Sequence, residues 1–453
     1  MTTRKLTRRR LLQGASIALG MVVAGCAQQP PSPVSQPTSA PVATEAPPTV
    51  VPPTEAKPVS LSLWGWWDTR MNIYAEAAKA YAADQPNVQI AVETVPGGEL
   101  NQKVYAALAA GTGPTMLKMG TNFFKLREEG HLIELPEEIF PSDWLKQTYP
   151  DVDWSIYGRY VFTTGAMPVL MIYNKKMFAD AGLDPEVPPA TWADLLAFAR
   201  KLTQKDDSGA ISVCGYVPAM DDYPGVELTY QTGGNIIQIQ DGKQVSGWTT
   251  DAVRQVYQLL SDMAFKDMVW DSSFPGDTEA VGTGKAAITI DESWIIGEFK
   301  NTYADVYGDL GYALPATPSG KADPYYGYKR YVLDVAVMKG RADEYLPAFQ
   351  FIEYMQKQRP DVIMRLCEIS TLIPNRPDLT SDPKVLESPV NKVGIEALPK
   401  EYDVVMQPDE LWQIVADLVN RIAVQQVPLE EALALADAEW QQVLDDGLAK
   451  YMR

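Results

Sequence analysis

The 453-residue sequence contains one histidine and three cysteines, and the scarcity of both excludes several kinds of site. His131 lies in "EEGHLIEL", an expected helix-to-strand turn, where we predict a solvated or capping residue and not the base of a catalytic triad. One histidine also cannot form an HExxH zinc site or a histidine-rich metal cluster. No glycine-rich phosphate loop follows an expected strand, which argues against nucleotide binding. The acidic stretch "QKDDSGAIS" (204–212) lacks the spacing of a calcium loop, so we expect a turn there. The sequence thus predicts no metal, no cofactor and no catalytic residue.

Basic residues are also in short supply. The chain has 39 Lys and Arg against 58 Asp and Glu, a net charge of −19. Loss of residues 1–25, which contain five basic and no acidic residues, would make the charge about −24. Because such a surface repels phosphate backbones, we expect no nucleic-acid partner. Cys214 and Cys367 are compatible either with a disulfide in an exported protein or with two buried thiols, and the sequence leaves both possibilities open.

The first 25 residues are predicted to be a signal peptide. They combine a basic start, an apolar run and small residues at the end. "TRRRLL" resembles the twin-arginine export signature, and "VAGC" resembles a lipobox, which would make Cys26 the lipid-bearing first residue of the mature chain. A single membrane-spanning helix is the alternative, but the apolar run is short for a bilayer.

Residues 26–58 are predicted to be a tether. Ten prolines fall within positions 27–58, where large apolar side chains are almost missing. Such a segment buries too little surface to fold. We therefore expect an extended linker between a lipid anchor and a folded head, and an O-glycosylated stalk is compatible with the same composition.

From residue 59 the pattern alternates between strand and helix. A strand over 59–66 is followed by a helix that Asp68 is predicted to cap, and further strand and helix patterns follow up to residue 130. Such alternation predicts βαβ units and a parallel sheet. "AAITID", "GYALPA" and "RYVLDVAVM" indicate later strands, and the sequence from "DELWQIV" onward is strongly helical.

The stretch "LSLWGWWDTR" (61–70) places three tryptophans at the end of the first expected strand. Trp64 and Trp66 would share one face of that strand, while Trp67 and Asp68 would lie at its carboxyl tip. Ligands of open α/β sheets bind beyond the carboxyl ends of strands. We therefore predict that Trp66 and Trp67 form a ligand wall and that Trp64 is partly core.

Several motifs in order resemble those of the extracellular solute-binding proteins of ABC importers, in the family that takes up sugars. They are "AALAAGTGPTMLKMG", "REEGHLIEL", "LMIYNKKMFADAGLDPEVPPATWADLLAFARKLT", "GKAAITIDESW" and "TLIPNRPDL". Thr115 stands where the family usually has Asp, and Glu292 stands where it has Gly. The resemblance covers residues 59–450.

The resemblance implies a two-lobed periplasmic-binding-protein fold of the type II α/β class, with discontinuous lobes hinged around a central cleft. One lobe would comprise residues 59–165 and 320–372, and the other residues 166–319 and 373–453. The hinge would lie near "TTGAMP", "ATPSG" and "STLIPN".

The resemblance also implies a set of ligand-binding positions, in which indoles stack on sugar rings and Asp or Asn bind hydroxyls. The predicted positions are Trp64, Trp66, Trp67, Asp68, Asn122, Thr164, Met167, Asp221, Tyr223, Trp294, Tyr326, Arg330 and Trp412. Core packing is the alternative for Met167 and Trp412, and a surface loop for "YYGYKR" (325–330). Trp192 is predicted to be structural.

The resulting hypothesis is a monomeric, non-catalytic lipoprotein on the outer face of the cell membrane. It would capture an uncharged mono- or oligosaccharide by hinge closure and deliver it to the permease subunits of an ABC transporter. One alternative is a receptor for glycerol phosphate, a polyamine or iron; a pocket for an anion should show converging Arg and Lys. Another is a secreted carbohydrate-active enzyme, since no sequence feature excludes a pair of carboxylates.

Overall fold

The computed structural model describes residues 58–220, 223–404, 408–450 and 452. The predicted signal peptide, Cys26, nearly all of the tether and Asp221 lie outside the described residues. Among the residues described, no helix has the length and apolar character needed to cross a bilayer.

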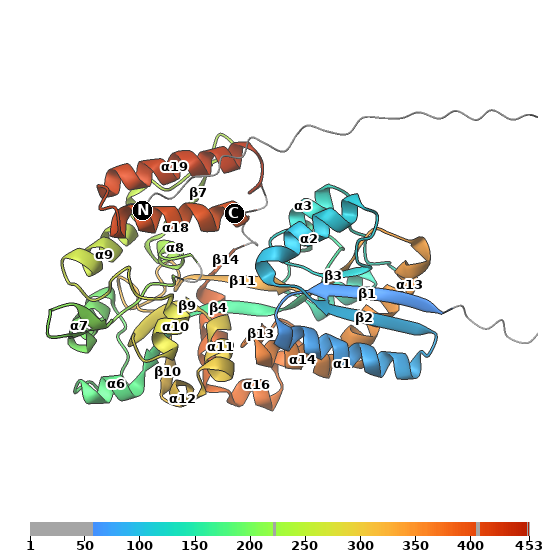
Figure 1. The fold of residues 1–453 in the computed structure, drawn as a ribbon, viewed down its shortest axis with the longest axis horizontal. Coiled ribbons are helices and arrows are strands. Elements are labelled where there is room, and N and C mark those ends of the chain that lie inside the picture. The colour runs from blue at the N-terminus through green and yellow to red at the C-terminus, as the bar shows by residue number, and fades with distance from the viewer. Residues whose placement is uncertain (1–57, 221–222, 405–407, 451, 453) are drawn as a thin grey trace, which may run out of the picture. The chain divides into compact units, whose positions relative to one another are not determined.

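The first sheet is built from the predicted βαβ units. Its strands are β1 (Val59–Gly65), β2 (Val88–Thr94), β3 (Met116–Lys118) and β12 (Val335–Val337), in the order β12-β3-β1-β2. The first three strands run parallel, and β12 is antiparallel to β3. Helices α1 (Asp68–Asp84) and α2 (Gly97–Ala109) connect the parallel strands and lie on opposite faces of the sheet (Figure 1). The parallel βαβ prediction is confirmed.

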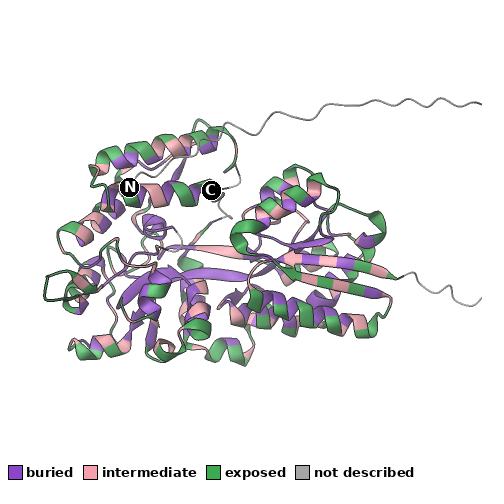
Figure 2. Ribbon diagram, in the orientation of Figure 1, coloured by how far each residue is buried: buried purple, intermediate pink, exposed green. Residues whose placement is uncertain are grey.

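The second sheet is organised around one long strand, β4 (Thr163–Asn174), all of whose residues are buried (Figure 2). Every strand that pairs with β4 is antiparallel to it. Toward its start β4 pairs with β11 (Tyr328–Leu333) and β13 (Ile373–Pro374). Toward its end it pairs with β9 (Ile288–Glu292) and β10 (Leu310–Ala313). The edge strand β14 (Tyr402–Asp403) runs parallel to β11.

Shorter elements complete the structure. Two hairpins are formed by β5 (Gln204–Lys205) with β6 (Ile211–Val213), and by β7 (Ile237–Gln240) with β8 (Lys243–Ser246). The remaining helices up to the middle of the chain are α3 (Phe123–Glu128), α4 (Ser142–Thr148), α5 (Trp154–Tyr157), α6 (Lys175–Asp180), α7 (Trp192–Leu202), α8 (Val226–Thr229), η1 (Tyr230–Thr232), α9 (Asp251–Phe265), α10 (Asp277–Gly282), α11 (Trp294–Thr302) and α12 (Ala304–Tyr307). The later ones are α13 (Ala342–Glu353), η2 (Tyr354–Gln358), α14 (Pro360–Ile369), α15 (Pro377–Thr380), α16 (Pro383–Glu387), α17 (Pro389–Ala397), η3 (Leu398–Lys400), α18 (Asp409–Ala423) and α19 (Leu429–Asp445).

The buried apolar side chains form two clusters, and each draws on separate stretches of the chain. The first core comprises residues from Leu61 to Met167 and again from Val332 to Leu379. The second core runs from Val169 to Ala316, with Tyr328, and continues in the C-terminal helices. The chain therefore passes from one core to the other within β4. This order is that of the predicted discontinuous lobes, whose exact limits stay predictions.

Two details of the sequence interpretation need correction. Asp68 was expected to cap the first helix, but the capping position is Trp67, and Asp68 is the first helical residue. The run "RYVLDVAVM" was expected to be one strand, but Asp334 divides it into β11 and β12, which belong to different sheets. Asp334 is buried and accepts hydrogen bonds from Tyr74 and Gln356, so its side chain is fixed by contacts that a regular strand would not offer.

Other local expectations are met. Trp192 is buried, and its Nε1 donates to Gln231 at 2.7 Å, as befits a structural residue. "QKDDSGAIS" forms the β5–β6 hairpin, in whose turn Asp206 accepts hydrogen bonds from backbone N–H groups. Cys214 and Cys367 are free buried thiols in different cores, and burial raises the pKa of each to about 12. Of the two possibilities left open by the sequence, the structure shows the unpaired one.

Candidate functional site

A cavity of about 630 Å³ lies where the two cores meet. Its walls come from the carboxyl ends of β1 and β3, the first turns of α1 and α2, strands β4 and β11, and the starts of α11 and α18. The lining residues are Trp66, Trp67, Arg70, Gly97, Gly98, Leu100, Asn101, Lys118, Gly120, Thr121, Asn122, Met167, Tyr223, Trp294, Arg330, Val332 and Trp412. The parallel strands thus present their carboxyl ends to the cavity, as expected for an α/β sheet.

Aromatic side chains dominate this wall. Trp67 and Trp294 meet edge to face, with ring centroids 6.1 Å apart. Trp66 lies over two glycines, and a Cβ atom at Gly120 would lie only 2.7 Å from its ring. The bare backbone at Gly120 therefore leaves the space that the indole of Trp66 occupies.

Trp67 has an unusual backbone conformation. Its φ is 77° and its ψ is 92°, a region that a bulky side chain rarely adopts. Such a conformation costs on the order of 1–3 kcal/mol and persists only where the surrounding structure imposes it. Here it lies between the end of β1 and the start of α1, and it directs the chain so that two successive indoles line the cavity.

The same wall contains three basic side chains. The ammonium group of Lys118 lies 3.5 Å from the ring centroid of Trp66, a cation–π contact. Arg70 lies with its guanidinium carbon 5.8 Å from the ring centroid of Trp67. Arg330 forms a 2.6 Å ion pair with the fully buried carboxylate of Glu292, on the strand at the other side of β4.

Burial and neighbouring charge govern the titration of these groups. Desolvation holds the pKa of Lys118 well below its ordinary value, and the nearby positive charges of Arg70 and Arg330 lower it further. The negative charge of Asp334 acts in the opposite direction and raises the pKa of Lys118. Burial raises the pKa of Asp334 itself, while its hydrogen bond from Tyr74 and the charge of Arg70 lower it.

Some polar atoms in the wall have no hydrogen-bond partner within the described part of the chain. They are Nε and Nη1 of Arg70 and both amide atoms of Asn122. Both residues are at least nine-tenths buried. Since buried polar groups in folded proteins are almost always hydrogen-bonded, these atoms point to a polar ligand in the cavity.

Eight of the predicted positions are brought together around this cavity: Trp66, Trp67, Asn122, Met167, Tyr223, Trp294, Arg330 and Trp412. Met167 therefore both lines the cavity and packs in the first core. Trp412 is 46 % exposed at its edge, so it is not a core residue.

Four predicted positions lie elsewhere. Trp64 packs against the first core, and the ammonium group of Lys103 lies over its outer face. Asp68 is exposed on the first turn of α1. Thr164 is fully buried behind the wall, where its Oγ1 accepts a hydrogen bond from Arg70 at 3.4 Å. Tyr326 is buried away from the cavity, and its carbonyl oxygen accepts a hydrogen bond from the side-chain amide of Gln231.

The sequence interpretation missed the basic residues nearest the indoles. Arg70 follows the chosen Asp68 by two positions, and helical geometry turns Arg70 inward and Asp68 outward. Lys118 could have been noticed as a charge within the otherwise apolar strand "MLK", because Lys is almost never fully buried without a role or a partner. The lining glycines and Asn101 carried no local signal.

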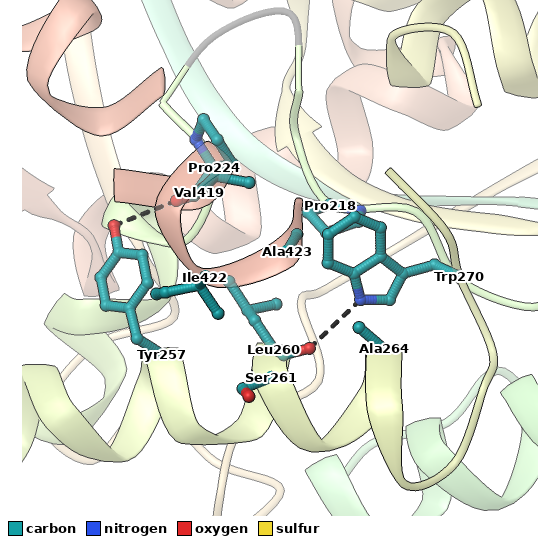
Figure 3. Close-up of a pocket in the computed structure, with 10 residues that line it drawn as sticks. All are labelled: Pro218, Pro224, Tyr257, Leu260, Ser261, Ala264, Trp270, Val419, Ile422 and Ala423. Carbon is teal, nitrogen blue, oxygen red and sulfur yellow. Dashed lines mark hydrogen bonds between the residues drawn. The ribbon is translucent and has the colours of Figure 1, made fainter. Parts of the chain in front are cut away.

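A second, much smaller space of about 10 Å³ lies between α9 and α18 (Figure 3). Tyr257 donates a hydrogen bond to the Pro224 carbonyl there, and Trp270 donates to the carbonyl of Leu260. A space of this size holds a single water at most. It is therefore a gap in helix packing and not a ligand site.

Comparison with known sequences agrees with this geometry. The family described as "Bacterial extracellular solute-binding protein" matches residues 67–359, which is more than half of the chain. An uncharacterised ABC transporter extracellular-binding protein of Pyrococcus horikoshii is 25% identical over 264 residues, covering 55% of this chain and 60% of its own length. The sn-glycerol-3-phosphate-binding periplasmic protein of Yersinia pestis is 31% identical over 204 residues, which cover 42% of this chain and 43% of the relative's own length. The chain thus spans less than two thirds of the length of these relatives.

Solved structures share the fold. A solute-binding protein of Thermotoga lettingae bound to α-D-tagatose matches with a TM-score of 0.69 and 21% identity, over 86% of this chain and all of the other. The maltose/maltodextrin-binding domain of Bdellovibrio bacteriovorus bound to maltotriose matches with a TM-score of 0.70 and 16% identity, over the same shares. These similarities confirm the predicted periplasmic-binding-protein fold, and the family is one of binding proteins and not of enzymes. The chain belongs to the bacterial extracellular solute-binding protein family.

Proposed function

We propose that this protein is the receptor component of an ABC importer and that it captures a carbohydrate in the cavity between its two cores. The observation that carries the proposal is the aromatic wall formed by Trp66, Trp67 and Trp294. Indole faces offer flat apolar surface to the C–H face of a sugar ring, while Asn122 and the charged residues offer hydrogen bonds to its hydroxyls. The cavity volume lies within the usual range for small-molecule sites.

Hinge closure is the proposed mechanism. The cavity takes residues from both cores, so a ligand that contacts both favours the form in which they are close together. The proposed lobes are residues 59–165 with 320–372, and residues 166–319 with 373–453. The connections between them then absorb the motion, as hinge segments do.

The site of action is proposed from the N-terminal sequence. A lipidated Cys26 followed by the proline-rich segment would hold the receptor on the outer face of the cell membrane. There it would deliver its ligand, as a monomer, to the permease subunits of the transporter.

A receptor for a non-sugar solute is the second candidate, and one observation favours an anionic one. Arg70, Lys118 and Arg330 converge on the cavity, whereas no carboxylate of the described residues lines it. A polyamine would need acidic residues in those places. Glycerol phosphate, which the Yersinia pestis relative is named for binding, fits the basic wall better.

A binding and turnover measurement tests the proposal. The purified full-length chain is screened for thermal stabilisation by neutral sugars, acidic sugars, glycerol phosphate and polyamines. We expect stabilisation by a carbohydrate without any cleavage product, because a ligand that binds only the folded state raises Tm. Stabilisation by polyamines alone would contradict the proposal. So would hydrolysis of an oligosaccharide that is lost when one carboxylate is replaced, since that would identify an enzyme.

A further inference from the structure

Arg70 is placed as though to bind a group that the chain itself does not supply. It lies in the first turn of α1, lines the cavity, and is only 1 % exposed. Its Nη2 donates to Thr164 Oγ1 at 3.4 Å, but Nε and Nη1 have no partner among the described residues. A buried cation with two unmatched N–H donors is unfavourable unless an acceptor, preferably an anionic one, accepts hydrogen bonds from those donors.

Lys118 adds a second buried cation at the same wall. Its side chain rises from β3, is 3 % exposed, and lines the cavity with its ammonium group over Trp66. Both Arg70 and Arg330 lie close enough to disfavour its protonated form. The negative charge of Asp334 favours the protonated form and offsets part of this effect.

The nearby carboxylates do not fill this site. Glu292 is engaged by Arg330, and Asp334 accepts hydrogen bonds from Tyr74 and Gln356. Neither of these carboxylates lines the cavity. Asp334 acts on Arg70 and Lys118 through its charge, but among the described residues it leaves the Nε and Nη1 donors of Arg70 without a hydrogen-bond partner. These donors lie beside the indole of Trp67, and the ammonium group of Lys118 lies beside that of Trp66.

We propose that the ligand is an acidic carbohydrate, whose carboxylate or phosphate group is bound by Arg70 and Lys118 while its ring stacks on the indoles. The inference rests on the proposed receptor function and narrows its ligand, which the sequence interpretation took to be uncharged. A guanidinium group offers parallel N–H donors that match a carboxylate or a phosphate, and an ammonium group adds a point charge. Asn122, with both amide atoms unmatched, is available to the sugar hydroxyls.

The test compares ligands that differ only in the anionic group. Binding to the purified full-length chain is measured by calorimetry with galactose, galacturonate and galactose 6-phosphate, with the corresponding glucose compounds, with their β-linked neutral and uronate disaccharides, and with glycerol and sn-glycerol 3-phosphate. We expect an acid to bind at least about tenfold more tightly than its neutral partner, since charge-assisted hydrogen bonds are the stronger ones. The carboxylate and phosphate arms then distinguish the two sources of the anion.

Variants connect the preference to the named side chains. Arg70→Met and Lys118→Met should each lose most of the preference for the acid and leave Tm of the ligand-free protein unchanged or higher, because an unmatched buried charge is removed. Arg70→Lys should keep part of the preference. Arg200→Met removes an equal charge from an exposed side chain that pairs with Asp267 and does not line the cavity, so it should leave binding unchanged.

Each alternative result has a definite meaning. Equal binding of neutral and acidic partners, or binding of neutral sugars only, overturns the inference and leaves the receptor proposal intact. A lower Tm of Arg70→Met with equal losses for both ligand classes also overturns it, because Arg70 is then a structural residue. Binding of no carbohydrate of either class overturns both proposals.

Discussion

Trp67 and Trp294 join the two halves of the cavity through an edge-to-face contact, with ring centroids 6.1 Å apart and planes 65° apart. Trp67 follows β1 of the first sheet, whereas Trp294 begins α11 and packs against both cores. Trp67 therefore comes from the half that contains the first sheet and Trp294 from the other half, and both indoles line the cavity. A ligand that contacts this pair is therefore in contact with both halves, which is the property a hinge-closing receptor needs.

Replacement of the indoles should weaken binding more than it weakens folding. We expect Trp66→Ala and Trp294→Ala to lower the affinity for the proposed carbohydrate ligand by about tenfold or more each, because stacking area is lost. Trp64→Ala is the matched control, since this neighbouring indole packs against the first core and does not line the cavity. Calorimetric Kd values and Tm are measured together; an equal loss of affinity in Trp64→Ala would contradict the assignment of the wall.

The glycine beneath Trp66 offers a test of geometry. A methyl group at Gly120 would lie 2.7 Å from the Trp66 ring, so Gly120→Ala must displace the indole. We expect an affinity loss of about tenfold, with a change in tryptophan fluorescence. Gly98→Ala also alters a lining residue, but its added Cβ would meet no atom within 4 Å. Unchanged affinity in Gly120→Ala would show that the position of Trp66 does not matter for binding.

A buried carboxyl group in the second core should make stability depend on pH. Burial raises the pKa of Glu227 from an ordinary 4.5 to about 8. Between pH 4.5 and about pH 8, Glu227 therefore keeps its proton in the folded state and has lost it in the unfolded state. The free energy of unfolding should fall as pH rises through this window, by up to about 1.4 kcal/mol per pH unit from this group.

The variant Glu227→Gln tests this dependence directly. It keeps an oxygen for the hydrogen bond donated by the Gly225 backbone N–H, and it cannot ionise. We expect urea-denaturation curves to show a smaller loss of stability between pH 5 and pH 8 than in the original chain. Glu396→Gln, which alters an exposed side chain, should leave the dependence as it was. The same slope in Glu227→Gln would show that other groups cause it.

The anchor predicted from the sequence can be tested in cells. Cys26→Ser removes the only thiol in the lipobox-like motif, so we expect the protein to leave the detergent-soluble membrane fraction or to accumulate with its signal peptide attached. Gln28→Ser, two positions further on, should fractionate as the original chain does. An uncleaved signal peptide can also hold the variant at the membrane, so the original chain is labelled with a radioactive fatty acid as well. Unchanged membrane attachment of Cys26→Ser, together with no lipid label on the original chain, would favour the alternative of a membrane-spanning N-terminal helix.

Local patterns accounted for a large part of the fold. The alternation of strand and helix from residue 59 corresponds to β1 through α3, and the helical C-terminus corresponds to α18 and α19. The division of "RYVLDVAVM" at Asp334 was not foreseeable, because it depends on pairing with distant segments. The Asp334 backbone N–H donates to the carbonyl of Phe162, and the Asp334 carbonyl accepts from the N–H of Met119. Apolar periodicity reports which face of an element is buried, and it does not report which element buries it.

The sequence by itself determined that three tryptophans lie at the carboxyl end of a strand in a parallel sheet. That followed from local hydrophobic period, which each segment carries independently of the others. Only the tertiary structure decided that Arg70 faces the cavity and Asp68 faces water, and that Lys118 lies over Trp66. The physical reason is that the environment of a charge depends on packing between distant segments: α1, β3 and β4 must come together before these cations are buried side by side.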